Sequence, residues 1–322
     1  MRKMQQMIRS SATILTALVA LLSAGCAADG TRQEAAFEQN IQRTKQALVA
    51  AGDADSLSAA AMLVERPRDE PLERLALISR AVTAAPDRAD LVWLNLQFCS
   101  QVNSCDPTPI EAHLHAVDPA NGAAWSSSIG RSAKVNDTAS VRKIMVAIAS
   151  AERFDIYWNT MIAHATNAVL KVRTLDSRTA LMATIGFAAA MAIPAYQQIS
   201  NACKGDNLKD PEVVQTCQRV SAVMRRGDTY ITEMIGVAIA KRVWPEGGAQ
   251  YLDAVSARRL AHYRMDMQSK TSVAMIGSDK YAEQHLQLLA THRSEQDVVL
   301  AELLGAGLNP NPPTGWIDKA GS

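Results

Sequence analysis

The sequence predicts an all-α fold, and two observations lead to this prediction. Apolar residues recur three or four positions apart along most of the chain, whereas the alternating β-branched runs typical of strands are few. Short polar segments rich in Gly, Pro, Asp and Asn, such as GDADS, NSCDPTP and DPANG, separate these stretches. The chain has 322 residues, of which 48% are hydrophobic, so it can bury a large core or build an extended solenoid.

The first 25 residues have the three parts of an export signal. Three basic residues precede an apolar core over residues 12–22, which is too short to span a bilayer, and small residues then lead to Cys26. The end of this segment, LSAGC, resembles the lipobox of bacterial lipoproteins, although Ser23 stands where that family usually has Leu. The resemblance implies that Cys26 becomes the lipid-bearing first residue of the mature chain. The alternative is an ordinary signal peptide that is cut after Ala27 or Ala28 and leaves no anchor.

The residue after the cysteine bears on location. In lipoproteins of Gram-negative cells, Asp at this position favours retention in the inner membrane, and here it is Ala27. The resemblance therefore implies the inner leaflet of the outer membrane, facing the periplasm, with residues 26–34 as lipidated cysteine and flexible tether. A soluble periplasmic protein is the alternative. The mature chain has 30 basic and 32 acidic residues, a balance that gives no electrostatic basis for binding nucleic acid.

Four cysteines remain, and an oxidising compartment favours disulfides between them. Cys99 and Cys105 are six residues apart and Cys203 and Cys217 are fourteen apart. Proximity therefore favours the pairs Cys99–Cys105 and Cys203–Cys217, while the other two pairings stay open. A metal site is a further alternative, but neither pair has the C-x-x-C spacing typical of zinc sites. We expect no metal.

Three tryptophans suggest a repeat. Trp93, Trp125 and Trp158 recur at intervals of 32 and 33 residues, and in HAVDPANGAAW a helix ends at Pro119 six residues before the second of them. This pattern resembles the tetratricopeptide repeat, a helix–turn–helix unit of about 34 residues, over residues 70–165. The resemblance implies a solenoid of helix pairs. Ordinary helix pairs with tryptophans at chance spacing are the alternative, and on either interpretation the indoles belong to the core.

The helical-repeat region, residues 35–200, ends in an uncharged stretch from Thr179 to Cys203. Alanine dominates this stretch, Pro194 interrupts it, and a membrane span would need roughly 20 apolar residues. A buried helix is therefore a better interpretation than a membrane-spanning one.

A helical C-terminal region is expected over residues 201–305. Asp228 is expected to cap the helix TYITEMIGVAIAKRVW, which a Pro and two Gly residues end. Further helices are expected at about 250–268 and 278–304.

The Pro-rich tail, residues 306–322, suits an extended segment that lays Trp316 back onto the fold, and a solvated tail is the alternative. Together the lipobox, the Trp-containing helix pairs, the CKGDN stretch and the PP-x-GW tail resemble proteobacterial lipoproteins with degenerate tetratricopeptide-like helical repeats. That resemblance implies no activity.

These observations predict a non-enzymatic, membrane-anchored lipoprotein whose helical repeats present a concave surface to a protein partner. We expect no cofactor and no catalytic residue. The alternatives are an immunity protein that neutralises an envelope-targeting toxin, and an enzyme whose site would need convergent titratable groups in one pocket. The residues expected to bind the partner are polar side chains of the repeats and three basic doublets: Asn95, Gln97, Asn159, Arg225, Arg226, Lys241, Arg242, Arg258 and Arg259.

Overall fold

The computed structural model describes residues 27–64, 71–191, 194–275 and 277–317. All the regular elements in these ranges are helices, which confirms the all-α fold. Cys26 and the predicted signal lie outside the described residues. No helix in the described ranges is long and apolar enough to cross a membrane.

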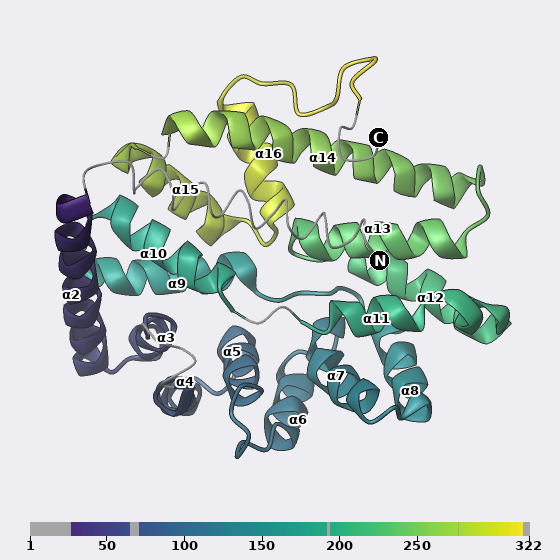
Figure 1. Ribbon diagram of the computed structural model, residues 1–322, viewed down its shortest axis with the longest axis horizontal. Coiled ribbons are helices and arrows are strands. Elements are labelled where there is room, and N and C mark those ends of the chain that lie inside the picture. The colour runs from purple at the N-terminus through teal and green to yellow at the C-terminus, as the bar shows by residue number, and fades with distance from the viewer. Residues whose placement is uncertain (1–26, 65–70, 192–193, 276, 318–322) are drawn as a thin grey trace.

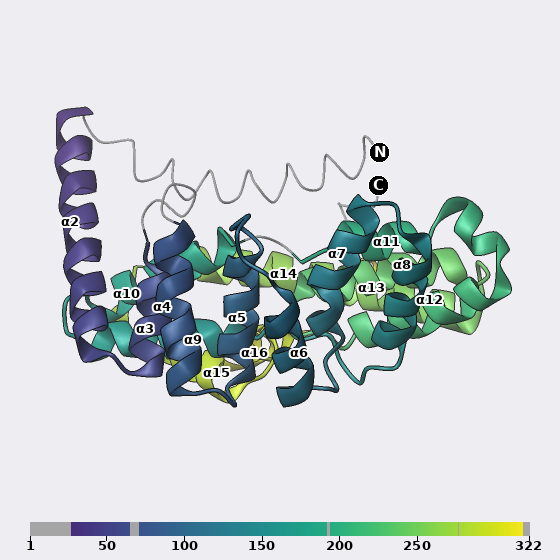
Figure 2. The same cartoon turned by 90° about the horizontal axis from the view of Figure 1, so that it is seen from below.

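The first half of the chain forms a row of upright helices, and α3–α8 stand side by side in Figure 2. The helices of this half, with the short 3₁₀ turn η1, are α2 (Ala27–Ala51), α3 (Ala54–Met62), α4 (Pro71–Ala84), α5 (Ala89–Cys99), α6 (Thr108–Val117), η1 (Gly122–Trp125), α7 (Ser126–Lys134) and α8 (Thr138–Ala149). The backbone of α2 is helical from Ala27, so the segment expected to be a flexible tether is the start of a helix.

The second half forms a layer across this row. In Figures 1 and 2, α9, α10, α14 and α15 run roughly at right angles to α3–α8. The elements of this layer are α9 (Trp158–Lys171), α10 (Ser177–Ala189), α11 (Tyr196–Ala202), η2 (Gly205–Lys209), α12 (Pro211–Met224), α13 (Tyr230–Val243), α14 (Ala249–Met275), α15 (Asp279–Thr291) and α16 (Glu295–Gly305). The layers meet where α9 packs on α3 and α5, and where α12 packs on α8.

Local sequence signals set many helix boundaries. Asp53, Asp137 and Asp176 precede α3, α8 and α10, and each side chain accepts a hydrogen bond from a first-turn backbone N–H. Ser294 does the same for α16, accepting from the N–H of Asp297, so the single helix expected over 278–304 is two helices. These caps satisfy backbone donors that the helix itself leaves without a partner.

Both disulfides favoured by proximity are present. Cys99–Cys105 ties the end of α5 to the loop before α6. Cys203–Cys217 ties the end of α11 to α12. The loops they close are short, so the expected stabilisation is roughly 2.5 to 3 kcal/mol for each bond.

The tryptophans belong to the core, as expected. Trp93 is 2% exposed, whereas Trp125 and Trp158 are partly buried against the main cluster of apolar residues. Trp125 ends the 3₁₀ turn that leads into α7, but Trp158 begins a helix that leaves the row. The succession of upright helices therefore stops at α8, because α9 turns back to pack on α3 and α5.

The uncharged stretch from Thr179 to Cys203 gives two helices, α10 and α11. One side of α10 is buried, including Leu181 and Thr184, while Gly186 and Ala189 are exposed. The stretch is thus a half-buried surface helix and a short second helix, and the expectation of a central buried helix was wrong in that respect.

The reversal of the chain before α9 depends on a buried carboxyl group. Asp228, which is fully buried, accepts hydrogen bonds from the backbone N–H groups of Ile156 (3.0 Å) and Trp158 (2.9 Å). Between them, Tyr157 has a φ of 59°, in the left-handed region that non-glycine residues rarely adopt. Asp228 was expected to cap α13, and that expectation was wrong: Thr229 caps α13, and Asp228 fixes the start of α9.

A second buried carboxyl group, that of Asp155, lies beside Asp228. Burial and the charge of Asp155 raise the pKa of Asp228 well above its usual range. A proton held on Asp228 can be donated to Asp155, so the interior need not hold two adjacent negative charges. The outer oxygen of Asp155 is paired with Arg293 (3.1 Å) and, more loosely, with Arg153 (3.5 Å).

The same cluster reaches back to the row. Asn121 donates to the carbonyl of Asp155 (2.8 Å) and accepts from its N–H (2.8 Å). Asp118 accepts from Arg153 (2.6 Å) and from the hydroxyl of Tyr157 (2.6 Å). Loops that are distant in sequence are thereby joined at one buried point between the layers.

The predicted return of the tail onto the fold is confirmed. The ring of Trp316 meets Tyr263 of α14 edge-on, with 5.4 Å between the ring centroids. Arg259, also on α14, donates to the carbonyl of Trp316 (3.3 Å). The yellow end of the chain accordingly runs over α14 in Figure 1.

We predict that Asp228→Asn lowers the free energy of unfolding by about 2 kcal/mol, because the amide leaves one of the two buried N–H groups without an acceptor. Chemical denaturation of the oxidised chain measures this loss. The matched control is Asp137→Asn at the exposed cap of α8, where Asn caps as well as Asp and a change of less than about 0.5 kcal/mol is expected. Equal stability of the two variants would contradict the role given to Asp228.

Candidate functional site

The structure places three of the expected partner-binding residues in the interior. Asn95 and Gln97 of α5 are 7% and 8% exposed, and Asn159 of α9 is completely buried. Asn159 donates its side-chain N–H to the carbonyl of His292 (2.9 Å). The assignment of these residues to a partner surface was therefore wrong, because every residue of α5 from Asp90 to its end is buried among α4, α6 and α9.

Two of the basic doublets bind other parts of their own chain. Arg226 donates to the carbonyl of Glu152 (2.8 Å), which joins the end of α12 to the connector before α9. Arg242 donates to the hydroxyl of Ser200 (2.9 Å), and burial lowers the pKa of its guanidinium. Both contacts hold elements of the second layer in place.

The remaining arginines of the doublets are also engaged. Arg225 forms an ion pair with Asp253 of α14 (2.7 Å). Arg258 is partly buried, and Arg259 donates to carbonyls of the tail. The arginines of the three doublets therefore contact other groups of the chain and do not form one shared binding surface.

The first turns of α14 and the end of α13 carry the best candidate for a binding surface, which we call the α14 face. It is defined by Lys241 of α13 and by Tyr251, Leu252 and Val255 of α14. Leu252 and Val255 are 55% and 38% exposed and lie three residues apart, so they point to one side of the helix. The amine of Lys241 lies 5.7 Å from the centre of the Tyr251 ring. Exposed apolar side chains beside an aromatic ring and basic groups are typical of protein interfaces.

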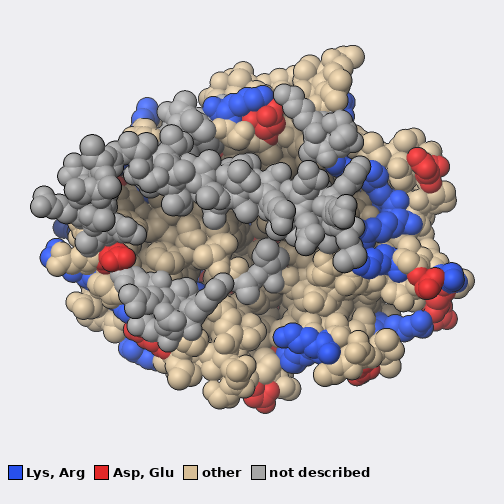
Figure 3. All heavy atoms as spheres, in the orientation of Figure 1, with Lys and Arg blue, Asp and Glu red and all other residues tan. Residues whose placement is uncertain are grey.

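The same part of the molecule is basic. Figure 3 shows Lys and Arg side chains gathered on the side where α12–α14 lie. The segment 214–264 contains eight basic residues and four acidic ones, one of which, Asp228, is buried. The basic residues are Arg219, Arg225, Arg226, Lys241, Arg242, Arg258, Arg259 and Arg264, and the acidic ones are Asp228, Glu233, Glu246 and Asp253. This excess favours a partner with an acidic surface.

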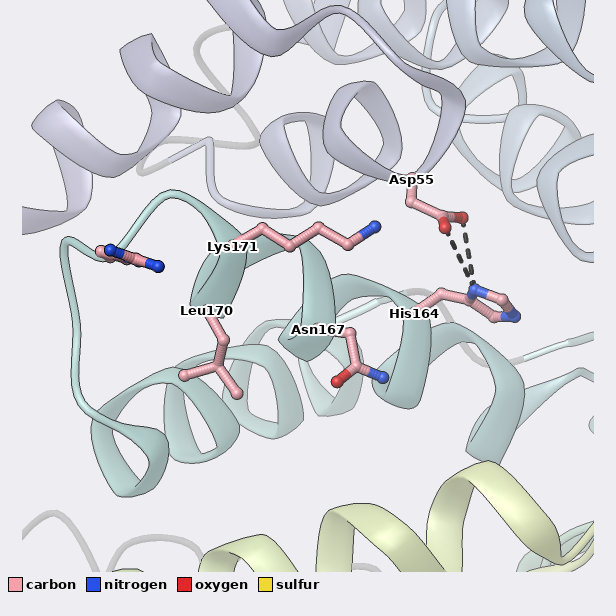
Figure 4. Close-up of a pocket in the computed structure, with 6 residues that line it drawn as sticks. Asp55, His164, Asn167, Leu170 and Lys171 are labelled. Atoms are coloured by element: carbon pink, nitrogen blue, oxygen red, sulfur yellow. Dashed lines mark hydrogen bonds and ion pairs between the residues drawn. The ribbon is translucent and has the colours of Figure 1, made fainter.

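A second candidate is an opening between α3 and α9 with a volume of about 650 Å³, lined by Asp55, His164, Asn167, Leu170, Lys171 and Arg173. Figure 4 shows Asp55 and His164 pointing toward one another, and Lys171 reaching into the same gap from α9. His164 Nδ1 lies 3.3 Å from the carboxylate of Asp55. The sequence could not indicate this pair, because its members are 109 residues apart.

The carboxylate of Asp55 is strongly held in its charged form. The hydrogen bond with His164 is the largest cause that lowers its pKa, to about 2, and the nearby Arg88, which donates to it at 3.2 Å, adds to the effect. Arg88 in turn pairs with Asp90 at 2.6 Å. Asp55 therefore orients His164, while Lys171 and Asn167 offer hydrogen-bond donors suited to a carboxylate or another anionic group.

Comparison of the chain with protein-family models, curated proteins and solved structures gave no match. In the ranges that the structure describes, no group of three or more His, Cys, Asp or Glu residues is arranged to hold a metal ion. The candidate sites therefore rest on geometry alone.

We predict that Asp55→Asn makes stability less sensitive to acid. A carboxyl group whose folded-state pKa is about 2 stabilises the fold above pH 4, and this contribution disappears as the pH falls from about 4 to 2. At this partly exposed site the contribution should be about 1 to 2 kcal/mol.

The measurement is the difference in unfolding free energy between pH 6 and pH 2.5 for the wild-type chain and for Asp55→Asn. The control is Asp206→Asn on η2, whose side chain is 91% exposed and whose substitution should leave the difference unchanged. An Asp55→Asn chain with the full wild-type loss of stability would contradict the prediction.

Proposed function

We propose that the protein is a membrane-anchored periplasmic lipoprotein without enzymatic activity that binds a protein partner. The anchor is the lipid on Cys26, in the inner leaflet of the outer membrane. Two observations support export: LSAGC at the end of an apolar segment, and two disulfides, which form and persist in oxidising compartments. Several acyl chains on one cysteine would hold the body at the membrane without any contribution from its fold.

The observation that carries partner binding is the α14 face. Leu252 is more than half exposed although it stands beside Val255 and the ring of Tyr251, and the surrounding segment is basic. Large apolar side chains at the centre of a patch with a polar rim supply most of the binding energy in typical interfaces. The proposed partner therefore covers the α14 face with apolar side chains and surrounds it with acidic ones.

The upright helices α3–α8 fit the same proposal as a degenerate tetratricopeptide-like array. Pro119 precedes Trp125 at the repeat's spacing, and the helices on either side of this turn are α6 and α7. In this proposal the array is a support, because its residues Asn95 and Gln97 are buried and the outer surface of α14 meets the partner.

Anchoring is tested with Cys26→Ser. We expect the variant to leave the membrane fraction and to appear in the soluble periplasmic fraction, because the lipid-bearing thiol is missing. The control is Ser23→Ala, which keeps the cysteine and should stay with the membrane. Continued membrane fractionation of Cys26→Ser after washing with high salt would show that the lipid is not the anchor.

Partner binding is tested with Leu252→Asp in the full chain, crosslinked in the native host and purified through a tag. An aspartate at the centre of an apolar contact should reduce recovery of the partner at least tenfold. The matched control is Val135→Asp on the loop after α7, where the side chain is 75% exposed and lies away from α14. Equal recovery with both variants would place the interface elsewhere.

A further inference from the structure

The tail is held on α14 through its backbone. Four tail carbonyls accept hydrogen bonds from three α14 side chains, Arg259, Tyr263 and Arg264. The carbonyl of Asn309 accepts from the hydroxyl of Tyr263 (3.1 Å), that of Pro310 from Arg264 Nε (3.2 Å), that of Pro313 from Arg259 Nη2 (2.9 Å) and that of Trp316 from Arg259 Nε (3.3 Å). We call this surface of Arg259, Tyr263 and Arg264 the tail groove.

This mode of contact selects a backbone shape more than a sequence. Proline-rich segments adopt an extended helix that leaves every carbonyl free to accept, and aromatic grooves recognise such segments at little entropic cost. Among the described tail residues, Trp316 meets Tyr263 edge-on and Leu308 packs on the apolar cluster that includes Ala261, while Asn309, Asn311 and Pro313 are exposed. The tail groove can therefore accept another extended proline-rich segment in the place of the tail.

The tail groove continues into the α14 face. Residues 252, 255, 259 and 263 of a helix lie along one side of it, at spacings of three and four. From Asn309 to Pro313 the tail runs from Tyr263 toward Arg259, which is the direction of Val255 and Leu252. It then turns at Gly315 (φ 83°), where the N–H of Trp316 donates to the carbonyl of Pro313 (3.1 Å) and the Trp316 ring returns to Tyr263. Val255 and Leu252 remain 38% and 55% exposed beyond this turn.

We infer that the tail groove binds an extended, proline-rich segment of the partner protein, and that the chain's own tail is an intramolecular competitor for it. The partner segment carries large apolar side chains after its prolines, and these cover Val255 and Leu252. This inference rests on the proposed function and deepens it by naming the chemistry of the partner.

Competition between the two segments decides occupancy. A tethered tail acts at an effective concentration on the order of millimolar, so a free segment with the same contacts would not displace it. A partner segment that also covers Leu252 gains apolar contact that the described tail does not make. The two exposed side chains thus give the partner an advantage over the tail.

The test uses the full oxidised chain and fluorescein-labelled peptides, with binding followed by fluorescence anisotropy. The first peptide has the sequence of residues 308–317, and the second has the same sequence followed by two leucines. Trp316→Ala removes the ring contact with Tyr263 and so weakens the binding of the tail to its groove. This variant should therefore bind the first peptide at least tenfold more tightly than the wild-type chain does. For the wild-type chain, the second peptide should bind at least fivefold more tightly than the first.

Two variants separate the contacts. In the Trp316→Ala background, Tyr263→Phe removes the hydroxyl donor and should weaken the binding of both peptides roughly fivefold. Leu252→Asp should abolish only the tighter binding of the peptide that carries the two leucines. Lys270→Ala, at an exposed position further along α14, is the control and should change the affinity for neither peptide. A peptide with its prolines replaced by alanine should bind at least fivefold less tightly.

Equal binding of the first peptide to the wild-type and Trp316→Ala chains, or no binding to either, would overturn the inference. So would a wild-type dimer in light scattering that Tyr263→Phe converts to a monomer, because the groove would then hold the tail of a second copy. Neither result depends on the membrane or on the native partner, so the proposed function would still stand on the tests with Cys26→Ser and Leu252→Asp.

Discussion

The carboxyl group of Asp228 fixes the point at which the chain changes direction, and the rest of the architecture depends on that point. It accepts the N–H groups of Ile156 and Trp158, so the backbone can pass through a left-handed residue at Tyr157 without leaving buried donors unpaired. From there α9 returns across the row of upright helices instead of extending it. Burial and the charge of Asp155 raise the pKa of Asp228, which favours the neutral form of this carboxyl group at the junction.

The course of α9 decides which surfaces a partner can reach. Because α9 packs on α3 and α5, the inner side of the row is part of the core. Asn95 of α5 is buried and accepts a hydrogen bond from Ser79 of the neighbouring α4. The opening lined by Asp55 and His164 lies at this junction. The outer side of the second layer remains, and there α14 exposes Leu252 and Val255. Repeat solenoids normally bind on a concave side, whereas in this chain α9 packs on α3 and α5 and occupies one side of the row.

Features encoded by near neighbours in the sequence were predicted correctly. The helices follow from apolar spacing, and the disulfides Cys99–Cys105 and Cys203–Cys217 pair the nearest cysteines. The return of Trp316 was also predicted, and a turn at Gly315 brings its ring to Tyr263. The assignments that failed required knowledge of distant partners. Asp228 precedes α13 as a cap would, yet its partners lie 70 and 72 residues away. The buried side chain of Asn159 likewise donates its hydrogen bond to the carbonyl of His292, 133 residues further on.

By itself, the sequence determined the all-α class and favoured the two disulfides between the nearest cysteines, because both depend on residues close together in the chain. The export signal and the lipidation of Cys26 are its further predictions. The tertiary structure decided where the row of helices ends, which polar residues are buried and which face of α14 meets solvent. These depend on contacts between α3 and α9, α8 and α12, and the tail and α14. The pairing of such segments is set by packing and by buried hydrogen bonds, whose partners have no fixed spacing in the sequence.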